Sequence, residues 1–215
     1  MYNLMLIDDH PIVRLGIKSL LETNPDYQIC WEAGSRSEAL SLLEQESPCL
    51  VIVDLVLGRD DGLEFVKELK SAQPDLKILV MTMQDESVYA ERVLRAGADG
   101  FITKQDATEH LLEAVETILK GRVYLSRASS ARVLGRILKN EPAGGDPHIN
   151  SLSDRELHVF QMIGTGLQTK EIADSLGLSG KTIETYRENI KKKLGLPNAD
   201  ALKRAACTWV ETGKV

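Results

Sequence analysis

Short apolar runs alternate with amphipathic stretches over the first 120 residues. Residues 3–7, 50–53 and 77–81 are almost continuously apolar, which is typical of strands buried on both faces of a parallel sheet. Residues 28–33 and 100–102 are weaker strand candidates. Helical periodicity fills the intervals, at residues 11–23, 35–46, 62–72, 86–96 and 106–120. Five strands alternating with five helices predict a doubly wound α/β domain with a five-stranded parallel sheet.

The pattern changes in the last third of the chain. Residues 121–139 are compatible with a further helix, and residues 140–150 concentrate Pro, Gly and Asn, as linkers do. Only helical periodicity follows, at residues 153–166, 169–176, 180–194 and 198–211. We therefore expect a domain at residues 1–121, a partly helical linker at 122–150, and a small all-α domain at 151–215.

Three of the helix starts carry side chains at capping-box spacing. These are Ser35 with Glu38, Asp106 with Glu109 and Ser153 with Glu156. In such a box the first side chain caps the helix N-terminus, and the acidic one reaches back to the preceding backbone.

Charge divides the two predicted domains. The chain carries 26 basic and 32 acidic residues. Residues 151–215 hold 10 basic and 8 acidic side chains, so their net charge is +2 while the rest carries −8. This difference favours two modules with different partners. The three cysteines form no CxxC pair, and no apolar run approaches the roughly 20 residues of a membrane span. We expect a cytoplasmic protein without a membrane partner.

Reactive side chains follow the predicted strands. Asp8 and Asp9 come directly after the first strand, Asp54 after the third, Thr82 at the end of the fourth and Lys104 just past the fifth. The carboxyl ends of parallel strands meet at one sheet edge, where doubly wound folds gather their chemistry. We therefore expect these five side chains to lie together.

The chemistry that this set suggests is phosphoryl transfer to a carboxylate. Asp54 can attack phosphorus and form an acyl phosphate. Three carboxylates in one cleft repel each other unless a hard cation such as Mg²⁺ joins them. Lys104 and the Thr82 hydroxyl can then bind phosphoryl oxygens.

Residues 168–194 have the pattern of a helix, a short turn and a second helix. Gly177 permits the turn, and Ile183, Tyr186, Ile190 and Leu194 form the apolar stripe of the second helix. The opposite face is polar and is typical of a helix that enters a DNA major groove. Periodicity alone also fits an ordinary helical hairpin.

The first domain resembles the receiver domain of bacterial two-component response regulators, with a flavodoxin-like fold. The resemblance is carried by Asp8-Asp9, Asp54, Thr82, Lys104 and Gly97-Ala98. It implies that a sensor histidine kinase phosphorylates Asp54. It also implies Mg²⁺ bound by Asp9, Asp54 and the carbonyl of Val56, with Asp8 acting through water, and a switch role for Phe101. Such a receiver assists only its own phosphoryl transfer and dephosphorylation, so we expect no enzyme.

The tail resembles the LuxR-type helix-turn-helix, so the whole chain is similar to a NarL/FixJ-type response regulator. The matching segments begin at Leu152, Lys170, Leu178, Lys181 and Lys192. The resemblance implies double-stranded DNA as a partner and a homodimer when phosphorylated. The residues that would face DNA are Thr169, Lys170, Lys181, Thr182, Glu184, Thr185, Glu188, Lys191 and Lys192. Those that would form the dimer are Ala201, Leu202, Ala205 and Ala206.

The sequence departs from the family pattern at a few positions. Gly58 and Gln105 stand where relatives often have proline, which favours a flexible loop at 58–62 and puts a cis bond before residue 105 in doubt. Glu184 and Glu188 occupy groove-facing positions where relatives often carry Lys or Arg, and Tyr186 stands where many have His.

Two alternatives to a phosphorylation-controlled transcription regulator remain. The tail could bind a protein, which would make the chain a signalling adaptor, or the regulator could work without phosphorylation. A phosphatase or dehalogenase with an aspartate nucleophile needs an Asp at position 56, where this chain has Val. A nucleotide site is disfavoured because no glycine-rich phosphate loop follows the first strand.

Overall fold

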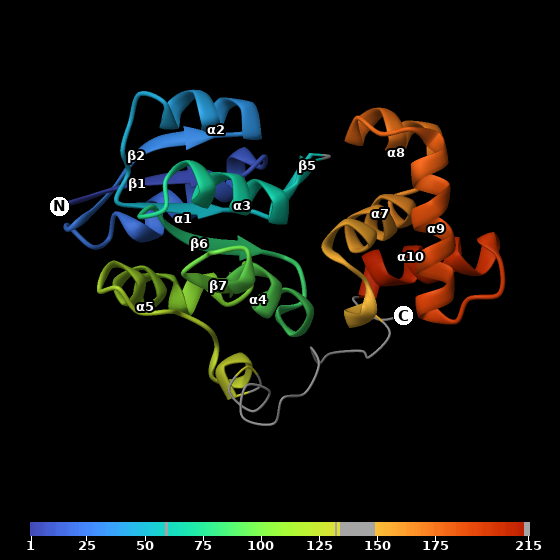
Figure 1. The fold of residues 1–215 in the computed structure, drawn as a ribbon. Helices are drawn as coiled ribbons and strands as arrows, with labels where there is room; N and C mark the ends of the chain where they lie inside the picture. The colour runs from blue at the N-terminus through green and yellow to red at the C-terminus, as the bar shows by residue number, and fades with distance from the viewer. Residues whose placement is uncertain (59, 132, 134–148, 213–215) are drawn as a thin grey trace. The chain divides into compact units, whose positions relative to one another are not determined.

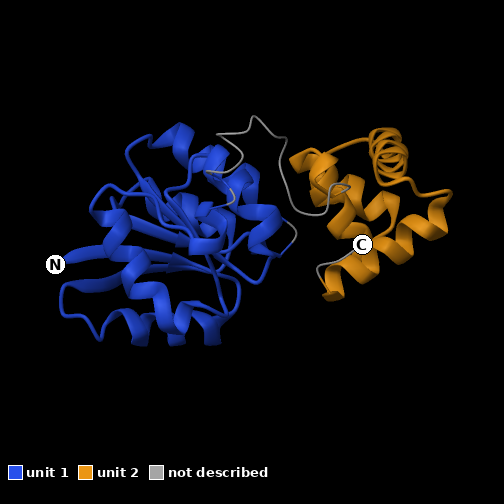
Figure 2. Ribbon diagram, turned by 90° about the horizontal axis from the view of Figure 1, so that it is seen from below, with its two compact units in different colours: residues 1–133 blue, residues 134–215 orange. Residues whose placement is uncertain are grey.

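The chain divides into two compact units, residues 1–133 and 134–215 (Figure 2). The computed structural model describes residues 1–58, 60–131, 133 and 149–212. The part of the predicted linker at residues 134–148 lies outside them. Each unit is described by itself.

A five-stranded parallel sheet forms the centre of the first unit, in the order β2-β1-β3-β6-β7 (Figure 1). The strands are β1 (Tyr2–Ile7), β2 (Tyr27–Ala33), β3 (Leu50–Val53), β6 (Lys77–Thr82) and β7 (Gly100–Thr103). All five predicted strands are confirmed. The order reverses direction between β1 and β3, so the carboxyl ends of these strands flank the crevice in which doubly wound sheets bind ligands.

Helices cover both faces of this sheet (Figure 1). α1 (Pro11–Leu21) and α5 (Ala107–Leu119) share one apolar core with the sheet. α2 (Arg36–Leu43), α3 (Gly62–Ala72) and α4 (Glu86–Arg95) pack on the other face. β3 is fully buried along its whole length, which explains why its sequence shows no polar alternation.

The loop after β3 forms a hairpin that the sequence did not predict. β4 (Val56–Leu57) pairs antiparallel with β5 (Asp60–Asp61). Gly58 turns the chain with a φ of 61°, a value that the proline of many relatives cannot adopt. Glycine therefore permits the positive φ with which the chain leaves β4, and the flexibility expected at residues 58–62 stays a prediction.

The structure also tests two other local expectations, the helix cap at Asp106 and the peptide bond before residue 105. Asp106 does not cap α5 with its side chain, because its carboxylate accepts a hydrogen bond from the Thr103 hydroxyl at 2.6 Å instead. The peptide bond between Lys104 and Gln105 is trans, since no bond among the described residues is cis.

Residues 122–131, which the sequence assigns to the linker, pack against the edge of the sheet. Tyr124 forms a parallel bridge with Gly100, and its carbonyl accepts a hydrogen bond from the Phe101 amide at 3.0 Å. A Cβ on Gly100 would lie 3.0 Å from that carbonyl, so glycine lets the segment approach. The first unit therefore extends to residue 133 rather than to the predicted 121.

Ser126 fastens this segment to α4. Its amide and its hydroxyl donate hydrogen bonds to the two carboxylate oxygens of Glu86, at 3.1 and 2.6 Å. Its Oγ also accepts the amide of Ser129, at the start of the helical residues 127–131. We call residues 122–131 the edge strap.

The second unit is helical, as predicted. It contains η1 (Ile149–Ser151), α7 (Asp154–Gly164), α8 (Thr169–Leu176), α9 (Gly180–Leu194) and α10 (Ala199–Thr212). The predicted capping box of Ser153 and Glu156 is present at the start of α7. Gly177 ends α8 in the left-handed conformation, with a φ of 63°, which supplies the sharp turn into α9.

Two of the four residues predicted to form a dimer surface on α10 are buried within the unit. Leu202 and Ala206 are fully buried within the unit, because α10 packs closely on α7. A Cβ on Gly164 of α7 would lie 2.3 Å from the Ala206 carbonyl. Only Ala201 and Ala205 remain half-buried, so Leu202 and Ala206 belong to the core of the unit and not to a free surface.

The strap contacts predict the effect of Ser126→Ala. Losing the hydroxyl removes a hydrogen bond to Glu86 and the cap of the following helix, which costs about 1 kcal/mol. We expect faster amide hydrogen exchange at Phe101, whose N–H is covered by the strap. Ser71→Ala is the control, since Ser71 is exposed and bonds only within α3; equal exchange rates in both variants would contradict a fastened strap.

Candidate functional site

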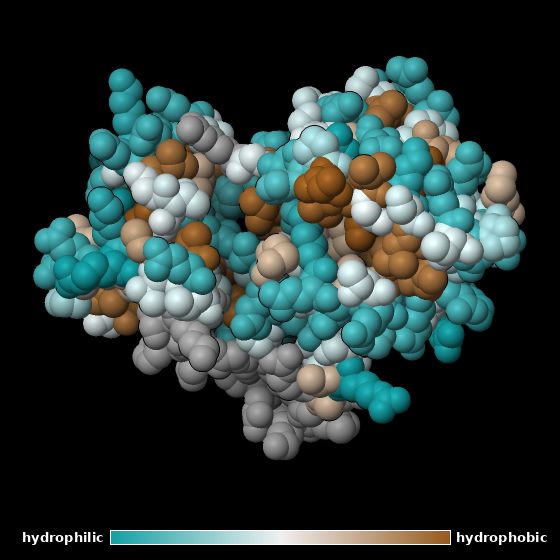
Figure 3. All heavy atoms as spheres, turned by 180° about the vertical axis from the view of Figure 1, so that it is seen from behind, coloured by the Kyte–Doolittle hydropathy of each residue, from teal (hydrophilic) through white to brown (hydrophobic). Residues whose placement is uncertain are grey.

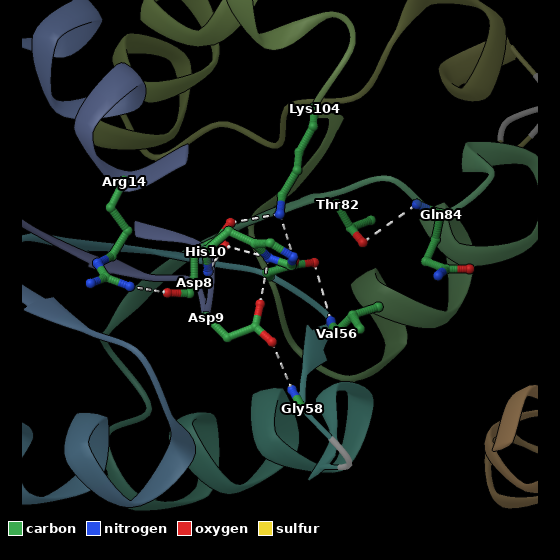
Figure 4. A network of polar contacts seen from close by, with 10 residues as sticks. Asp8, Asp9, His10, Arg14, Val56, Gly58, Thr82, Gln84 and Lys104 are labelled. Atoms are coloured by element: carbon green, nitrogen blue, oxygen red, sulfur yellow. Dashed lines mark hydrogen bonds and ion pairs between the residues drawn. The ribbon is translucent and has the colours of Figure 1, made fainter. Parts of the chain in front are cut away.

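The predicted reactive side chains meet at the carboxyl ends of the parallel strands (Figure 4). Asp8 and Asp9 follow β1, Asp54 follows β3, and Thr82 ends β6. Lys104 reaches in from the end of β7, so that every group comes from a strand end. Asp8, Asp54 and Thr82 are at most 2% exposed.

Lys104 bridges two buried carboxylates. Its Nζ lies 2.6 Å from Asp54 Oδ2 and 2.6 Å from Asp8 Oδ2. The lysine side chain itself is only 11% exposed. A buried charge without a partner is strongly unfavourable, so the ammonium is what allows the two carboxylates to remain buried next to each other.

Burial and pairing shift the pKa values of this pair. Burial raises the pKa of Asp54 above its usual value, although hydrogen bonds from Lys104, Val56 and Thr82 oppose the shift. Burial lowers the pKa of Lys104, but hydrogen bonds to Asp54 and Asp8 outweigh it, and the net shift is upward. Lys104 therefore stays a cation at neutral pH.

Backbone amides fix the orientation of the carboxylates. The Val56 amide donates to Asp54 Oδ1 at 3.1 Å, and the Gly58 amide donates to Asp9 Oδ2 at 3.1 Å. The β4–β5 hairpin thus contacts two of the three acids. The hydrogen bond to Asp9 comes from the amide of Gly58. Proline, which many relatives carry at this position, has no amide hydrogen and could not donate it.

The acidic side chains fit a hard divalent cation. Oδ2 of Asp8 and Oδ1 of Asp9 are buried, and each has one close nitrogen neighbour, Lys104 Nζ and His10 Nδ1 respectively, at 2.6 Å. The potential ligand atoms of Asp8, Asp9, His10 and Asp54 all lie within 4.8 Å of one another. Carboxylate oxygens are the ligands that Mg²⁺ prefers, so this cluster is a suitable magnesium site.

Two neighbours of the pocket were missed in the sequence. His10 Nδ1 lies 2.6 Å from Asp9 Oδ1, and its position directly after the acidic pair was the only available signal. Arg14 of α1 donates to the Asp8 carbonyl at 2.6 Å and also bonds Glu32 of β2. Arg14 thereby holds the end of β1 in place.

Thr82 and Phe101 lie between the pocket and the strap. Oγ1 of Thr82 accepts the Gln84 amide at 3.4 Å, in the loop that leads to Glu86. Phe101 is fully buried, and it lines a cavity of about 420 Å³ together with Glu86, Tyr124 and Ser126. The predicted switch residue thus lies beside the contacts that fasten the strap.

In the second unit, α8 and α9 form the predicted helix-turn-helix. Ile172, Ile183 and Ile190 are buried between the helices. Most of the residues predicted to face DNA are exposed, namely Lys170, Lys181, Glu184, Thr185, Glu188 and Lys192, while Thr169, Thr182 and Lys191 are half-buried.

The two glutamates on this surface are held by neighbours. The Thr169 hydroxyl donates to Glu184 Oε1 at 2.6 Å, across the two helices. Lys191 lies 2.8 Å from Glu188, and this hydrogen bond lowers the pKa of the Glu188 carboxyl. Lys191 is therefore committed to a carboxylate rather than standing free for a phosphate.

Lys193 has a structural role that the sequence did not indicate. Its Nζ lies 2.6 Å from Glu156 Oε2 and joins the end of α9 to the start of α7. Burial raises the pKa of Glu156, but hydrogen bonds from Lys193 and Ser153 outweigh it, so the net shift is downward.

Two family models match the chain. The response regulator receiver domain matches residues 4–116, and the bacterial regulatory proteins of the luxR family match residues 150–206. A putative transcriptional regulator of Pseudomonas aeruginosa is 37% identical over 194 residues, 90% of this chain and 91% of that protein. The positive transcription regulator BvgA of Bordetella pertussis, itself described as putative, is 33% identical over 196 residues, 90% of this chain and 91% of BvgA.

The chain is also similar to solved structures of the response regulator RcsB. RcsB of Salmonella enterica bound to promoter P1flhDC with the phosphomimetic BeF3− matches with a TM-score of 0.76 and 28% identity, covering 96% of this chain and 98% of RcsB. The fold and the acidic pocket define a receiver protein. The chain belongs to the response regulators that join a receiver to a LuxR-type DNA-binding domain. No helix among the described residues is long and apolar enough to cross a membrane.

The Glu156–Lys193 pair predicts how the second unit responds to acid. Because the folded pKa of Glu156 lies below its unfolded value, its contribution to stability is present above the unfolded pKa, near 4.3, and is lost as pH falls through the folded pKa. Lys193→Gln should lower the free energy of unfolding by about 2 kcal/mol at pH 7, with less loss below pH 4.

Urea unfolding followed by Trp209 fluorescence in a Trp31→Phe background measures this effect. Trp209 is buried in α10 and reports the second unit. Lys203→Gln, which changes an exposed lysine of α10, is the control. An equal destabilisation of both variants at pH 7 would refute the role of the pair.

Proposed function

We propose that a sensor histidine kinase phosphorylates Asp54, and that the phosphorylated chain dimerises and binds duplex DNA through α8 and α9. The observation that carries this proposal is the buried Lys104 ammonium, placed 2.6 Å from Asp54 in a chain that also holds a LuxR-type helix-turn-helix. In this proposal the protein acts in the bacterial cytoplasm, where the DNA lies.

In the first step, an Asp54 oxygen forms a bond to phosphorus, while the bond between phosphorus and the histidine nitrogen of the kinase breaks. Lys104 then pairs with a phosphoryl oxygen instead of the free carboxylate. Asp8, Asp9, Asp54 and the Val56 carbonyl would hold Mg²⁺, which supplies positive charge to the phosphoryl oxygens. We propose no enzymatic role for the chain beyond its own phosphorylation and dephosphorylation.

An apolar surface next to the pocket suits the helices of a kinase. Ile12 and Leu15 of α1 are 75% and 61% exposed, and Met83 is 62% exposed. Hydrophobic side chains also interrupt the hydrophilic surface on the face of the molecule that Figure 3 shows. Met83, together with Val13 and Ile17 of α1, lines an apolar cavity of about 480 Å³ that Lys104 also lines. Exposed apolar groups at such a rim are typical of a protein interaction site.

The contacts of the strap suggest a route for the signal. Phosphorylation adds acceptor oxygens that draw the Thr82 hydroxyl toward Asp54. Glu86 follows Thr82 by four residues and holds Ser126 through two hydrogen bonds. A shift of this loop would loosen the strap, which precedes the second unit in the sequence.

The similarity to RcsB supports the DNA-binding step. RcsB structures include complexes with promoter DNA, and one contains two RcsB dimers bound to two parallel DNAs. The LuxR-type match and the exposed lysines Lys170, Lys181 and Lys192 support the same output here. A protein-binding adaptor and a phosphorylation-independent regulator are the competing outcomes.

Sedimentation of the wild type and Asp54→Ala with Mg²⁺, with and without beryllofluoride and duplex DNA, tests the switch. We expect beryllofluoride to dimerise the wild type alone and to raise its DNA affinity by about 10-fold or more, since coupled equilibria typically shift by 1–3 kcal/mol. Equal stimulation of the variant would overturn the assignment of Asp54. Salt-insensitive or absent DNA binding would favour the adaptor.

The kinase surface is tested by Ile12→Asp. The charge should slow phosphotransfer from a kinase that phosphorylates the wild type by about 10-fold, which corresponds to 1.4 kcal/mol of lost contact. Phosphorylation by acetyl phosphate, which needs no docking surface, should not change. Val123→Asp is the matched control, because Val123 is also apolar and 60% exposed. If the rate of phosphorylation fell equally with the kinase and with acetyl phosphate, the substitution would act on the phosphorylation pocket and not on kinase docking.

A further inference from the structure

We propose that Glu184 and Glu188 read cytosine bases in the major groove, which makes them the residues that determine the DNA sequence this chain recognises. The inference rests on the proposed docking of α9 in DNA. Both side chains are largely exposed, at 56% for Glu184 and 59% for Glu188.

Glu184 is positioned before any DNA arrives. Oε1 accepts the Thr169 hydroxyl from the first turn of α8 at 2.6 Å. Arg187 Nε lies 3.8 Å from Oε2, too far for a good hydrogen bond. One oxygen is thus bound by the protein, and the other can accept a hydrogen bond from a base.

Glu188 is kept charged by its neighbour. Lys191, one turn further along α9, lies 2.8 Å from Oε1 and lowers the pKa of the carboxyl. The lysine also offsets the repulsion that a carboxylate would meet among DNA phosphates. An ionised carboxylate such as that of Glu188 is a hydrogen-bond acceptor only.

An acceptor selects the base edge that offers a donor. In the major groove guanine presents two acceptors, and thymine presents one acceptor and a methyl group. Adenine presents its N6 donor next to the N7 acceptor, which repels a carboxylate. Cytosine presents the N4 donor alone. Two ionised carboxylates facing the groove therefore favour cytosine over the other three bases.

The helical geometry sets the spacing of the two cytosines. Glu184 and Glu188 are four residues apart, which is about 6 Å along an α-helix. Successive bases on one strand rise by about 3.4 Å. The two cytosines are thus expected about two base steps apart in each half-site.

Selection from a random duplex library, with the full chain, Mg²⁺ and beryllofluoride, tests this readout. The wild type should enrich half-sites with two cytosines at this spacing. Glu184→Gln should change one of these positions from cytosine to adenine, because an amide pairs with adenine N6 and N7. Glu188→Gln should change only the other, each with a preference of roughly 10-fold or more.

Lys192→Gln is the control on the same helix. Loss of an exposed phosphate contact should weaken binding to all sequences alike and leave the consensus unchanged. An unaltered consensus in both glutamate variants would overturn the cytosine readout while leaving DNA binding intact. A wild type that enriches no duplex would overturn both the readout and the docking of α9.

Discussion

The buried ion triad of Asp8, Lys104 and Asp54 is the interaction on which the rest of this molecule depends. The three charged groups lie at the carboxyl ends of three different strands, so their contact exists only when the sheet has its native order. Together with Asp9 the pocket carries three carboxylates and one ammonium, a net charge of −2. This excess of negative charge suits a divalent cation. It also makes the electrostatics of the pocket sensitive to each phosphoryl group added or removed.

The same sheet connects the pocket to its outer edge. β7 carries Lys104 just beyond one end and pairs through Gly100 with the strap at the other. Glu86 stands where the loop from the pocket enters α4, and it uses both oxygens to hold Ser126. Rigid strands fix these two ends relative to one another, so a change of charge at Asp54 can alter how the chain leaves the receiver without unfolding the sheet.

The regular part of this structure could be predicted from its sequence, because buried strands and strand-end acids leave a strong local pattern. Three features could not. The Gly58 hairpin depends on a positive φ, which glycine permits but does not require. The strap depends on pairing between Gly100 and Tyr124, which are distant in the sequence. The burial of Leu202 inside the unit depends on its packing against α7. Helix periodicity predicts which residues form an apolar stripe, but it does not show whether another helix of the same unit or a second subunit covers that stripe.

The modest charge of the second unit explains why a phosphorylation switch is useful to it. A net charge of +2 over residues 151–215 gives little of the counterion release on which sequence-independent binding depends. Two carboxylates on the groove-facing helix weaken that general attraction further. A single unit therefore gains affinity mainly at matching bases, and two linked units gain it by acting on one duplex at high effective concentration. In the proposed switch, control of dimerisation from Asp54 would also control binding, and the proposed readout by the glutamates would limit that binding to matching sequences.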